Sequence, residues 1–168
     1  FLASLNTDQR KSIHEAAAKK HTSVIPDMPR MSLAEASMFE KYVKKANAYY
    51  EFGSGGSTKL ATRHQVTVYG VESDKRWVDT LRKESGPLCK VDYIDIGPTK
   101  EWGYPVNDSH KEKFPLYSES ILGFRQLFDF ILVDGRFRVA CTLNAIKHTL
   151  EMQVTCDNPL IFIHDFWD

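Results

Sequence analysis

Acidic residues follow five hydrophobic segments of this 168-residue chain, and they are the first sign of chemistry in it. They are Glu51, Glu72, Asp95, Asp134 and Asp165. Like charges that crowd one region raise each other's free energy, so five acids brought together need a reason. Capping of the helices that follow explains one or two of these positions well and five of them poorly. The pattern therefore favours a binding or catalytic site.

Three of the acids have residue types and positions that suit a nucleotide-like ligand. Glu72 could accept hydrogen bonds from both hydroxyls of a ribose. Asp95 could accept from an adenine amine, or it could only cap its loop. Asp134 lies where a methyl or hydride acceptor would sit, so it could be a general base or an orienting group.

Basic residues next to these acids offer further roles. His164 precedes Asp165 and could take the proton of a hydroxyl acceptor, although a hydrogen-bonded structural histidine fits almost as well. Arg136 could bind an anionic group or pair with a site carboxylate. We interpret Arg138 as a solvated surface residue, and the remaining histidines as surface or packing residues.

A glycine-rich run, Glu51-Phe52-Gly53-Ser54-Gly55-Gly56-Ser57-Thr58, joins a strand-like segment to a helix-like one. Glycines allow a ligand to approach the backbone closely. The free N–H groups at the start of a helix favour polar or anionic groups. Since the position of a third glycine holds Thr58, the run departs from the dinucleotide pattern G-x-G-x-x-G.

Strand and helix patterns alternate along the chain, which predicts right-handed βαβ units and a mostly parallel sheet with helices on both faces. The carboxyl ends of such strands meet at one edge, where ligands bind. We expect strands at Ala48–Phe52, Gln65–Val71, Lys90–Ile96, Phe128–Val133 and Leu160–Ile163. We expect helices at Thr7–Lys20, Ser32–Ala46, Ser57–Arg63, Asp74–Glu84 and Arg138–Leu150.

Two of these helices have apolar residues that we expect to face the core. In the helix that a capping box at Ser32–Glu35 opens, they are Leu33, Met38, Tyr42 and Val43. In the helix at 138–150 they are Val139, Leu143, Ile146 and Leu150.

The segment Gly97–Ser118 interrupts this alternation and contains three prolines. A loop of this length in a compact domain is usually functional, so we expect a lid or a substrate wall. Trp102 and Tyr104 are the residues that would line it. The alternative is a variable surface insertion.

Composition excludes several classes of protein. Lysine plus arginine and aspartate plus glutamate both number 22, which argues against a nucleic-acid binder, and no apolar run is long enough to cross a membrane. Cys89, Cys141 and Cys156 lack metal or disulfide spacing, so we expect reduced, buried thiols in a cytoplasmic protein. The absence of an initial Met suggests a fragment of a longer chain.

The pattern as a whole resembles the class I S-adenosylmethionine-dependent methyltransferases. Residues 51–56 resemble their first motif, Glu72 their ribose-binding acid and Asp95 their adenine-side acid. The run Phe130-Ile131-Leu132-Val133-Asp134-Gly135 resembles their fourth motif, at the methyl-transfer centre. The resemblance implies a Rossmann-like domain at 48–168, a helical cap over the cofactor at 1–47, and two more antiparallel strands that this chain lacks after Asp168.

A narrower resemblance is to small bacterial and viral-type methyltransferase-like proteins, some of which act on sugars or glycans. They share Asp-Ile-Gly-Pro-Thr-x-x-Trp-Gly, here 95–103, and Val-Asp-Gly-Arg-Phe-Arg-Val-Ala, here 133–140. The resemblance implies O-methylation of a sugar, glycan or other small molecule. A nicotinamide-dependent oxidoreductase and a non-catalytic cofactor-binding module of a larger protein are the alternatives.

The resemblance implies roles for individual residues. The cofactor-binding set is Glu51, Phe52, Gly53, Ser54, Gly55, Gly56, Ser57, Thr58, Glu72, Ser73, Asp95, Ile96 and Asp134. The catalytic set is Asp134, His164, Asp165 and Arg136, and the substrate set is Trp102, Tyr104 and Arg136. Asp134 and Asp165 match two magnesium ligands of catechol-type enzymes, but Phe166 replaces the third, so we expect no metal.

Overall fold

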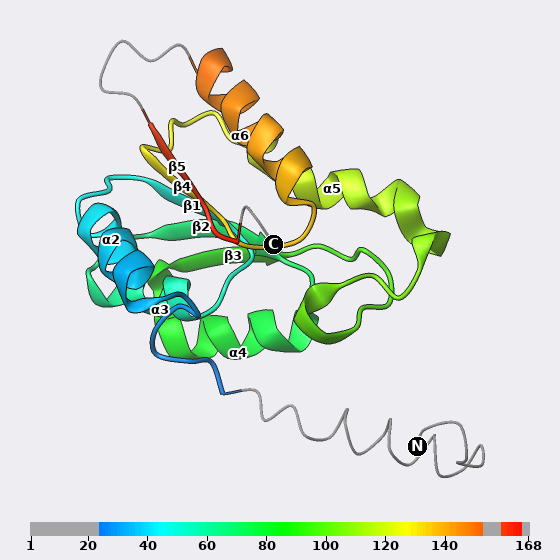
Figure 1. The fold of residues 1–168 in the computed structure, drawn as a ribbon, viewed down its shortest axis with the longest axis horizontal. Coiled ribbons are helices and arrows are strands. Elements are labelled where there is room, and N and C mark those ends of the chain that lie inside the picture. Colours follow the sequence, from blue (N-terminus) through cyan, green and yellow to red (C-terminus); the bar gives the residue numbers. More distant parts are fainter. Residues whose placement is uncertain (1–23, 153–158, 166–168) are drawn as a thin grey trace.

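The computed structural model of the chain describes residues 24–152 and 159–165. Five strands form one sheet in the order β3-β2-β1-β4-β5, and every neighbouring pair is parallel (Figure 1). The strands are β1 (Tyr49–Phe52), β2 (Val68–Glu72), β3 (Cys89–Tyr93), β4 (Phe130–Val133) and β5 (Leu160–Ile163). This arrangement confirms the predicted α/β, Rossmann-like fold.

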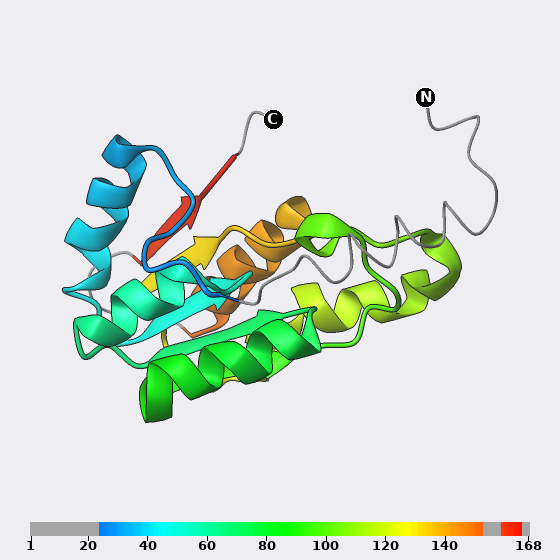
Figure 2. The ribbon, with the colours of Figure 1, turned by 90° about the horizontal axis from the view of Figure 1, so that it is seen from below.

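Helices cover both faces of the sheet, as Figure 2 shows, with α2, α3 and α4 on one face and α5 and α6 on the other. The α-helices are α2 (Leu33–Val43), α3 (Gly56–Arg63), α4 (Lys75–Ser85), α5 (Phe114–Ser118) and α6 (Arg138–Glu151). Short 3₁₀ helices are η2 (Gly86–Leu88), η3 (Glu101–Gly103), η4 (Asp108–Lys113) and η5 (Ser120–Gly123). The expected helix at Thr7–Lys20 lies outside the described residues.

The core consists of two layers because successive strand residues point to opposite faces. Tyr49 belongs to the layer under α2, α3 and α4, and Tyr50 to the layer under α5 and α6. All four residues of β1 and all four of β4 are buried. Such central, two-sided strands hold their carboxyl ends rigidly, which matters for the site described below.

The capping box of α2 is confirmed: the Glu35 N–H donates to Ser32 Oγ, and the Ser32 N–H donates to the Glu35 carboxylate. The predicted inward face of this helix is wrong except at Val43. Leu33 is 93% exposed, and the helix is anchored instead by Phe39, whose ring packs on Tyr49 and on two phenylalanines of the sheet. The aromatic contact outweighs the burial that the opposite face would have provided.

Helix α6 is also turned away from its predicted orientation. The predicted core residues Val139, Leu143, Ile146 and Leu150 are between 43% and 76% exposed. The buried face carries Cys141, Ala145 and His148. Small residues let a helix approach a sheet closely, and the His148 side chain is satisfied by the carbonyl of Gln126 at 3.0 Å.

The segment 97–118 folds into η3, η4 and α5 rather than remaining without helix. Cys89 and Cys141 are buried free thiols, as expected, and burial raises the pKa of Cys141 to about 12. Cys156 lies outside the described residues. Among the described helices, none has the length and apolar composition that a membrane span requires.

Candidate active site at the carboxyl edge of the sheet

The glycine-rich turn after β1 is built on a buried acid. Glu51 accepts hydrogen bonds from the hydroxyls of Tyr49 at 2.7 Å, Ser57 at 2.8 Å and Thr58. Burial raises the pKa of Glu51 to about 7, although these donors oppose the shift. The Thr58 hydroxyl also accepts from the Gly55 N–H at 3.1 Å. Glu51 therefore supports the turn from beneath and does not face the ligand side.

The turns after β1 and β4 touch at two glycines. Gly53 has φ +84°, and a Cβ there would lie 2.5 Å from the Cα of Gly135. Hydrogen bonds continue the sheet one residue past each strand, from the Gly53 N–H to Val71 and from the Asp134 N–H to Phe52. The contact brings the predicted cofactor turn directly beside Asp134.

Glu72, the predicted ribose acid, lies at the carboxyl end of β2 next to the glycine turn. Its Oε1 accepts from the backbone N–H groups of Ser73 and Asp74 and from the Ser73 hydroxyl. Within residues 24–152 and 159–165, its Oε2 accepts only from the Ser54 N–H, at 3.3 Å. Burial raises the pKa of Glu72. The second oxygen keeps a free lone pair, so the residue can still accept from a ligand hydroxyl.

The predicted adenine-side residues follow β3, which ends at Tyr93, two residues before Asp95. Asp95 accepts from the Lys113 ammonium at 2.6 Å and from the Gly97 N–H at 2.9 Å. The hydrogen bond from Lys113 lowers the pKa of Asp95. Ile96 is buried. Asp95 therefore fixes the start of the following segment, and adenine would have to share an oxygen with Lys113 or Gly97.

Asp134 and His164 form a close pair across β4 and β5. His164 Nδ1 lies 2.8 Å from Asp134 Oδ1, and the histidine is only 6% exposed. Burial raises the pKa of Asp134, and the hydrogen bond with His164 opposes that shift. The backbone holds the pair in place, because the His164 N–H donates to the carbonyl of Val133. The pair has the geometry of an acid that orients an imidazole.

Arg138 belongs to the same cluster, so its interpretation as a surface residue is wrong. Its Nη2 lies 3.3 Å from Asp134 Oδ1 and 3.6 Å from Asp165 Oδ2, and its side chain is 25% exposed. The first residue of α6 follows Asp134 by one helical turn, which brings it back over the acid. The spacing Asp134-x-x-x-Arg138 was the available signal for this contact.

Glu35, which the sequence indicated only as a helix-capping residue, approaches the site from α2. Its Oε2 lies 3.9 Å from His164 Nε2, and Asp165 Oδ1 lies 3.3 Å from the same nitrogen. Asp165 has a left-handed backbone with φ +49°. Three carboxylates therefore lie near the imidazole, one from α2 and two from the turns that follow β4 and β5. Only the fold brings Glu35 to this position, 129 residues earlier in the chain.

A divalent cation would be held, if anywhere in the described residues, by Asp134, His164 and Asp165, whose ligand atoms lie within 4.8 Å of one another. Two carboxylates and an imidazole form a plausible donor set for such ions. The guanidinium of Arg138 already neutralises both carboxylates. A metal would have to displace it, so the donor set fits poorly.

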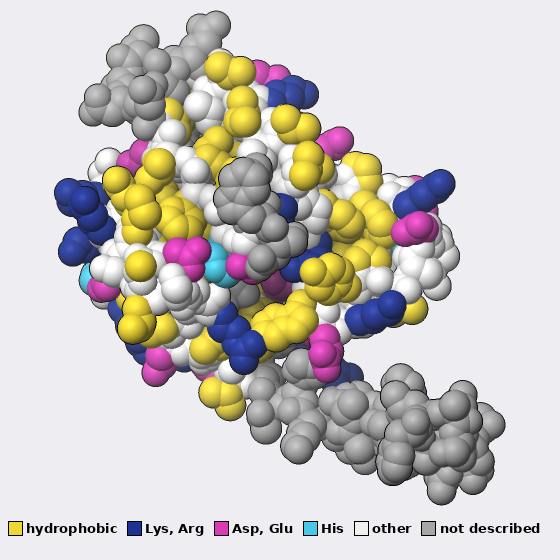
Figure 3. Space-filling view, viewed as in Figure 1, with side chains coloured by type: hydrophobic (Ala, Val, Ile, Leu, Met, Phe, Trp, Pro, Cys, Tyr) yellow, Lys and Arg dark blue, Asp and Glu magenta, His cyan; other side chains and the backbone are white. Residues whose placement is uncertain are grey.

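The segment 97–118 packs over this edge through η3. A Cβ on Gly103 would lie 2.9 Å from Ser73 Oγ and 3.6 Å from Arg136 Cγ. The two predicted substrate aromatics flank this glycine, and Tyr104 packs under the guanidinium of Arg136. The structure therefore brings Trp102 and Tyr104 close to the ends of β2 and β4. On the surface, charged and histidine side chains gather in this region beside hydrophobic ones (Figure 3).

Buried polar atoms without partners mark both ends of the site. Among the described residues they include Ser54 Oγ in the glycine turn and the Nε atoms of Arg136 and Arg138. Unsatisfied buried groups are rare and usually have a role. These three point to polar ligand groups at the two turns.

The fold places the chain in the class of Rossmann-like α/β proteins, with a glycine-rich turn after the first strand. Neither the models of known families nor the curated proteins include a match to this chain. A solved structure does match: a methyltransferase-like protein from Silicibacter pomeroyi DSS-3, 33% identical, with a TM-score of 0.63 over 74% of this chain and 68% of that one. The chain belongs to the family of this methyltransferase-like protein.

Proposed function

We propose that this protein is an S-adenosylmethionine-dependent methyltransferase that methylates a hydroxyl group of a sugar, a glycan or another small molecule. The observation that carries the proposal is the contact of Gly53 with Gly135. It sets a glycine-rich ligand turn directly against the Asp134–His164 pair. The membership in a methyltransferase-like family supports the same reading.

The residues at the turn suit the cofactor. The N–H groups that open α3 would face its carboxylate, the free oxygen of Glu72 would accept from its ribose, and Asp95 and Ile96 would flank its adenine. When bound, this cofactor supplies an electrophilic methyl group on a sulfonium, which is a good leaving centre. The protein's main task is then to align the acceptor oxygen for in-line displacement.

His164 is the proposed general base. Asp134 holds Nδ1, and Nε2, which lies 3.3 Å from Asp165 Oδ1, would take the proton of the acceptor hydroxyl as the oxygen attacks, once the acceptor displaces Asp165 from it. Asp134 and Asp165 would stabilise the positive charge that the imidazole gains. Arg138 holds both carboxylates in place. The turn that contains Trp102 would line the acceptor site.

Calorimetry with S-adenosylhomocysteine and with NAD tests the proposal. We expect the product of the cofactor to bind and NAD to show no heat of binding. NAD binding without S-adenosylhomocysteine binding would instead favour an oxidoreductase. Cofactor binding without methyl transfer to any of a panel of hydroxyl acceptors would favour a non-catalytic module.

A further inference from the structure

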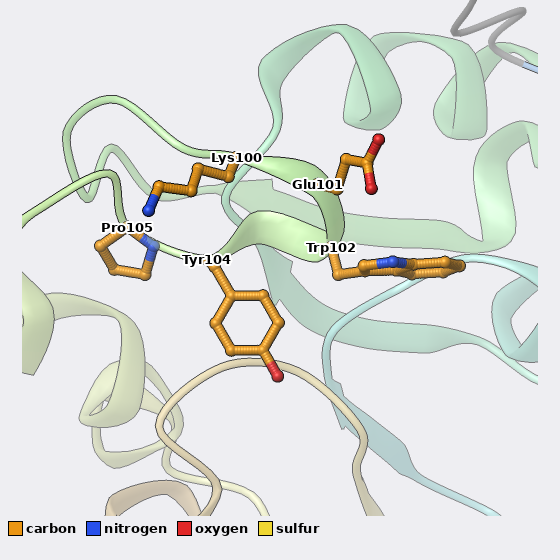
Figure 4. Close-up of a pocket in the computed structure, with 5 residues that line it drawn as sticks. All are labelled: Lys100, Glu101, Trp102, Tyr104 and Pro105. Carbon is orange, nitrogen blue, oxygen red and sulfur yellow. The ribbon is translucent and has the colours of Figure 1, made fainter. Parts of the chain in front are cut away.

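The η3 turn displays two aromatic rings to solvent. Trp102 is 63% exposed and Tyr104 is 55% exposed. Together with Lys100, Glu101 and Pro105 they line an open hollow of about 500 Å³ (Figure 4). Large exposed aromatics on one short turn are unusual unless they contact a ligand or partner.

The backbone of this turn has a strained conformation that keeps the two rings exposed. Trp102 has φ +61° and Gly103 has φ +71°. A tryptophan disfavours this left-handed conformation. The Lys100 N–H donates to the Tyr104 carbonyl at 2.6 Å and the Gly103 N–H to the Lys100 carbonyl, which closes the turn. Strain of this kind is concentrated at functional sites.

Two arginines from distant parts of the chain stack on these two rings. The guanidinium carbon of Arg30 lies 4.6 Å from the centre of the Trp102 ring, and that of Arg136 lies 3.8 Å from the centre of the Tyr104 ring. Stacking uses the flat face of a guanidinium. It leaves the N–H groups at the edge free to bind an anion in a forked geometry.

Neither arginine has an acidic partner within ion-pair distance among the described residues, whereas Arg138 contacts two acids. The Nε of Arg136 is buried and unpartnered. Lys100 is likewise outside the described ion pairs, and Glu101 is the one acid that lines the hollow. The rim of the acceptor region therefore carries excess positive charge, although the chain as a whole has a formal net charge of zero.

We propose that Arg30 and Arg136, stacked on Trp102 and Tyr104, bind a carboxylate or phosphate group on a ring-shaped acceptor. The inference rests on the proposed function and adds the chemical class of the acceptor to it. The ring faces that the arginines leave open would contact the acceptor, and the arginine edges would bind its anionic group. Gly103 lies against Arg136, which follows Asp134 by two residues, so a ligand held here would lie beside the turn that carries Asp134.

Matched pairs of probes test this by calorimetry in the presence of S-adenosylhomocysteine. The probes are D-glucuronate and D-glucose 6-phosphate, each against D-glucose, and benzoate against benzyl alcohol. We expect an anionic member to bind at least about tenfold more tightly than its neutral partner, since each charge-assisted contact contributes that much. The two sugar arms distinguish a carboxylate from a phosphate.

Variants test whether Arg30 and Arg136 cause this preference for the anion. Arg136→Gln should abolish the preference for the anion, Arg30→Gln should weaken it, and Arg136→Lys should restore it only in part. Arg125→Gln changes an exposed arginine that forms no ion pair within the described ranges, and it should keep the preference. S-adenosylhomocysteine affinity should be unchanged throughout.

The outcomes separate this inference from the proposed function. If S-adenosylhomocysteine binds but no anionic probe binds better than its neutral partner, the inference is overturned and the methyltransferase proposal stands. A preference that persists in Arg136→Gln also overturns it. If S-adenosylhomocysteine does not bind, the proposed function fails, and the same probe pairs without it still measure the anion preference.

Discussion

The acids in the two halves of the site contact different kinds of groups. At the ends of β1 and β2, Glu51 and Glu72 accept from hydroxyls and backbone N–H groups, and no cation of the described residues contacts them. At the ends of β4 and β5, Asp134 and Asp165 contact an imidazole and a guanidinium. In the first half the donors to the acids are uncharged, and in the second half the acids contact cationic or titratable groups.

We infer from this contrast that the two halves have different tasks. A frame of uncharged donors keeps its shape and presents fixed polar atoms to a ligand, which suits binding. A network of titratable groups can accept a proton and redistribute charge, which suits catalysis. We therefore expect changes in the first half to alter binding and stability, and changes in the second to alter turnover.

The largest expected effect is on turnover, from Asp134→Asn. The amide keeps the shape of the side chain but has no negative charge, so it cannot stabilise a protonated His164 as the carboxylate does. Methyl transfer should fall by roughly 10²- to 10⁴-fold. Mass spectrometry of a methylated acceptor measures it. Asp79→Asn, in an exposed pair with Lys75, is the matched control and should retain the wild-type rate.

Gly135→Ala tests the junction between the halves. The new Cβ would collide with the Tyr117 hydroxyl and would lie 2.8 Å from the Gly53 nitrogen. Overpacking of this kind costs about 1–3 kcal/mol of unfolding free energy, measured by urea denaturation. Gly123→Ala is the control, because a Cβ there meets nothing within 4 Å. Equal stability of the two variants would show that the turns do not need this contact.

Glu51 should make the free energy of unfolding depend on pH. Its folded-state pKa of about 7 exceeds the ordinary value of 4.5, so its stabilising contribution is complete below about pH 4.5 and is lost as the pH rises toward 7. The loss amounts to at most about 3 kcal/mol. Unfolding midpoints between pH 5 and 8 measure it. Glu51→Gln, which resembles the protonated acid, should flatten this dependence; an identical slope in both proteins would exclude Glu51 as its source.

The smallest expected effect is that of chelation. Because Arg138 already occupies the two carboxylates, EDTA should leave the transfer rate unchanged. Arg138→Gln frees the carboxylates, so this variant should gain measurable manganese binding by calorimetry, while the wild type shows none. A wild-type rate that falls with EDTA and returns with magnesium would contradict this account.

The sequence predicted the sheet because its central strands are short apolar runs with an acid or a glycine turn at the end. The periodicity of α6 was misleading, since this helix has two faces of small or apolar character. Val139 and Leu143 mark the more hydrophobic face, but Cys141 and Ala145 allow closer packing on the sheet. Hydrophobicity alone does not determine which face of the helix packs on the sheet.

The site was predictable where a strand ends and unpredictable where packing decides. Asp134 and His164 lie together because parallel strands share one edge. Glu35 approaches His164 only through the docking of α2, which depends on Phe39 and its aromatic neighbours. The stacking of Arg30 on Trp102 similarly joins segments that no local pattern connects.

The most direct test of the division between the halves is a calorimetric series with S-adenosylhomocysteine on the wild type, Glu72→Ala and Asp134→Asn. We predict that the wild type and Asp134→Asn bind equally well, and that Glu72→Ala binds at least about tenfold more weakly, because it would lose the proposed contacts with the ribose hydroxyls. Unchanged affinity in Glu72→Ala, or an equal loss in Asp134→Asn, would contradict the account.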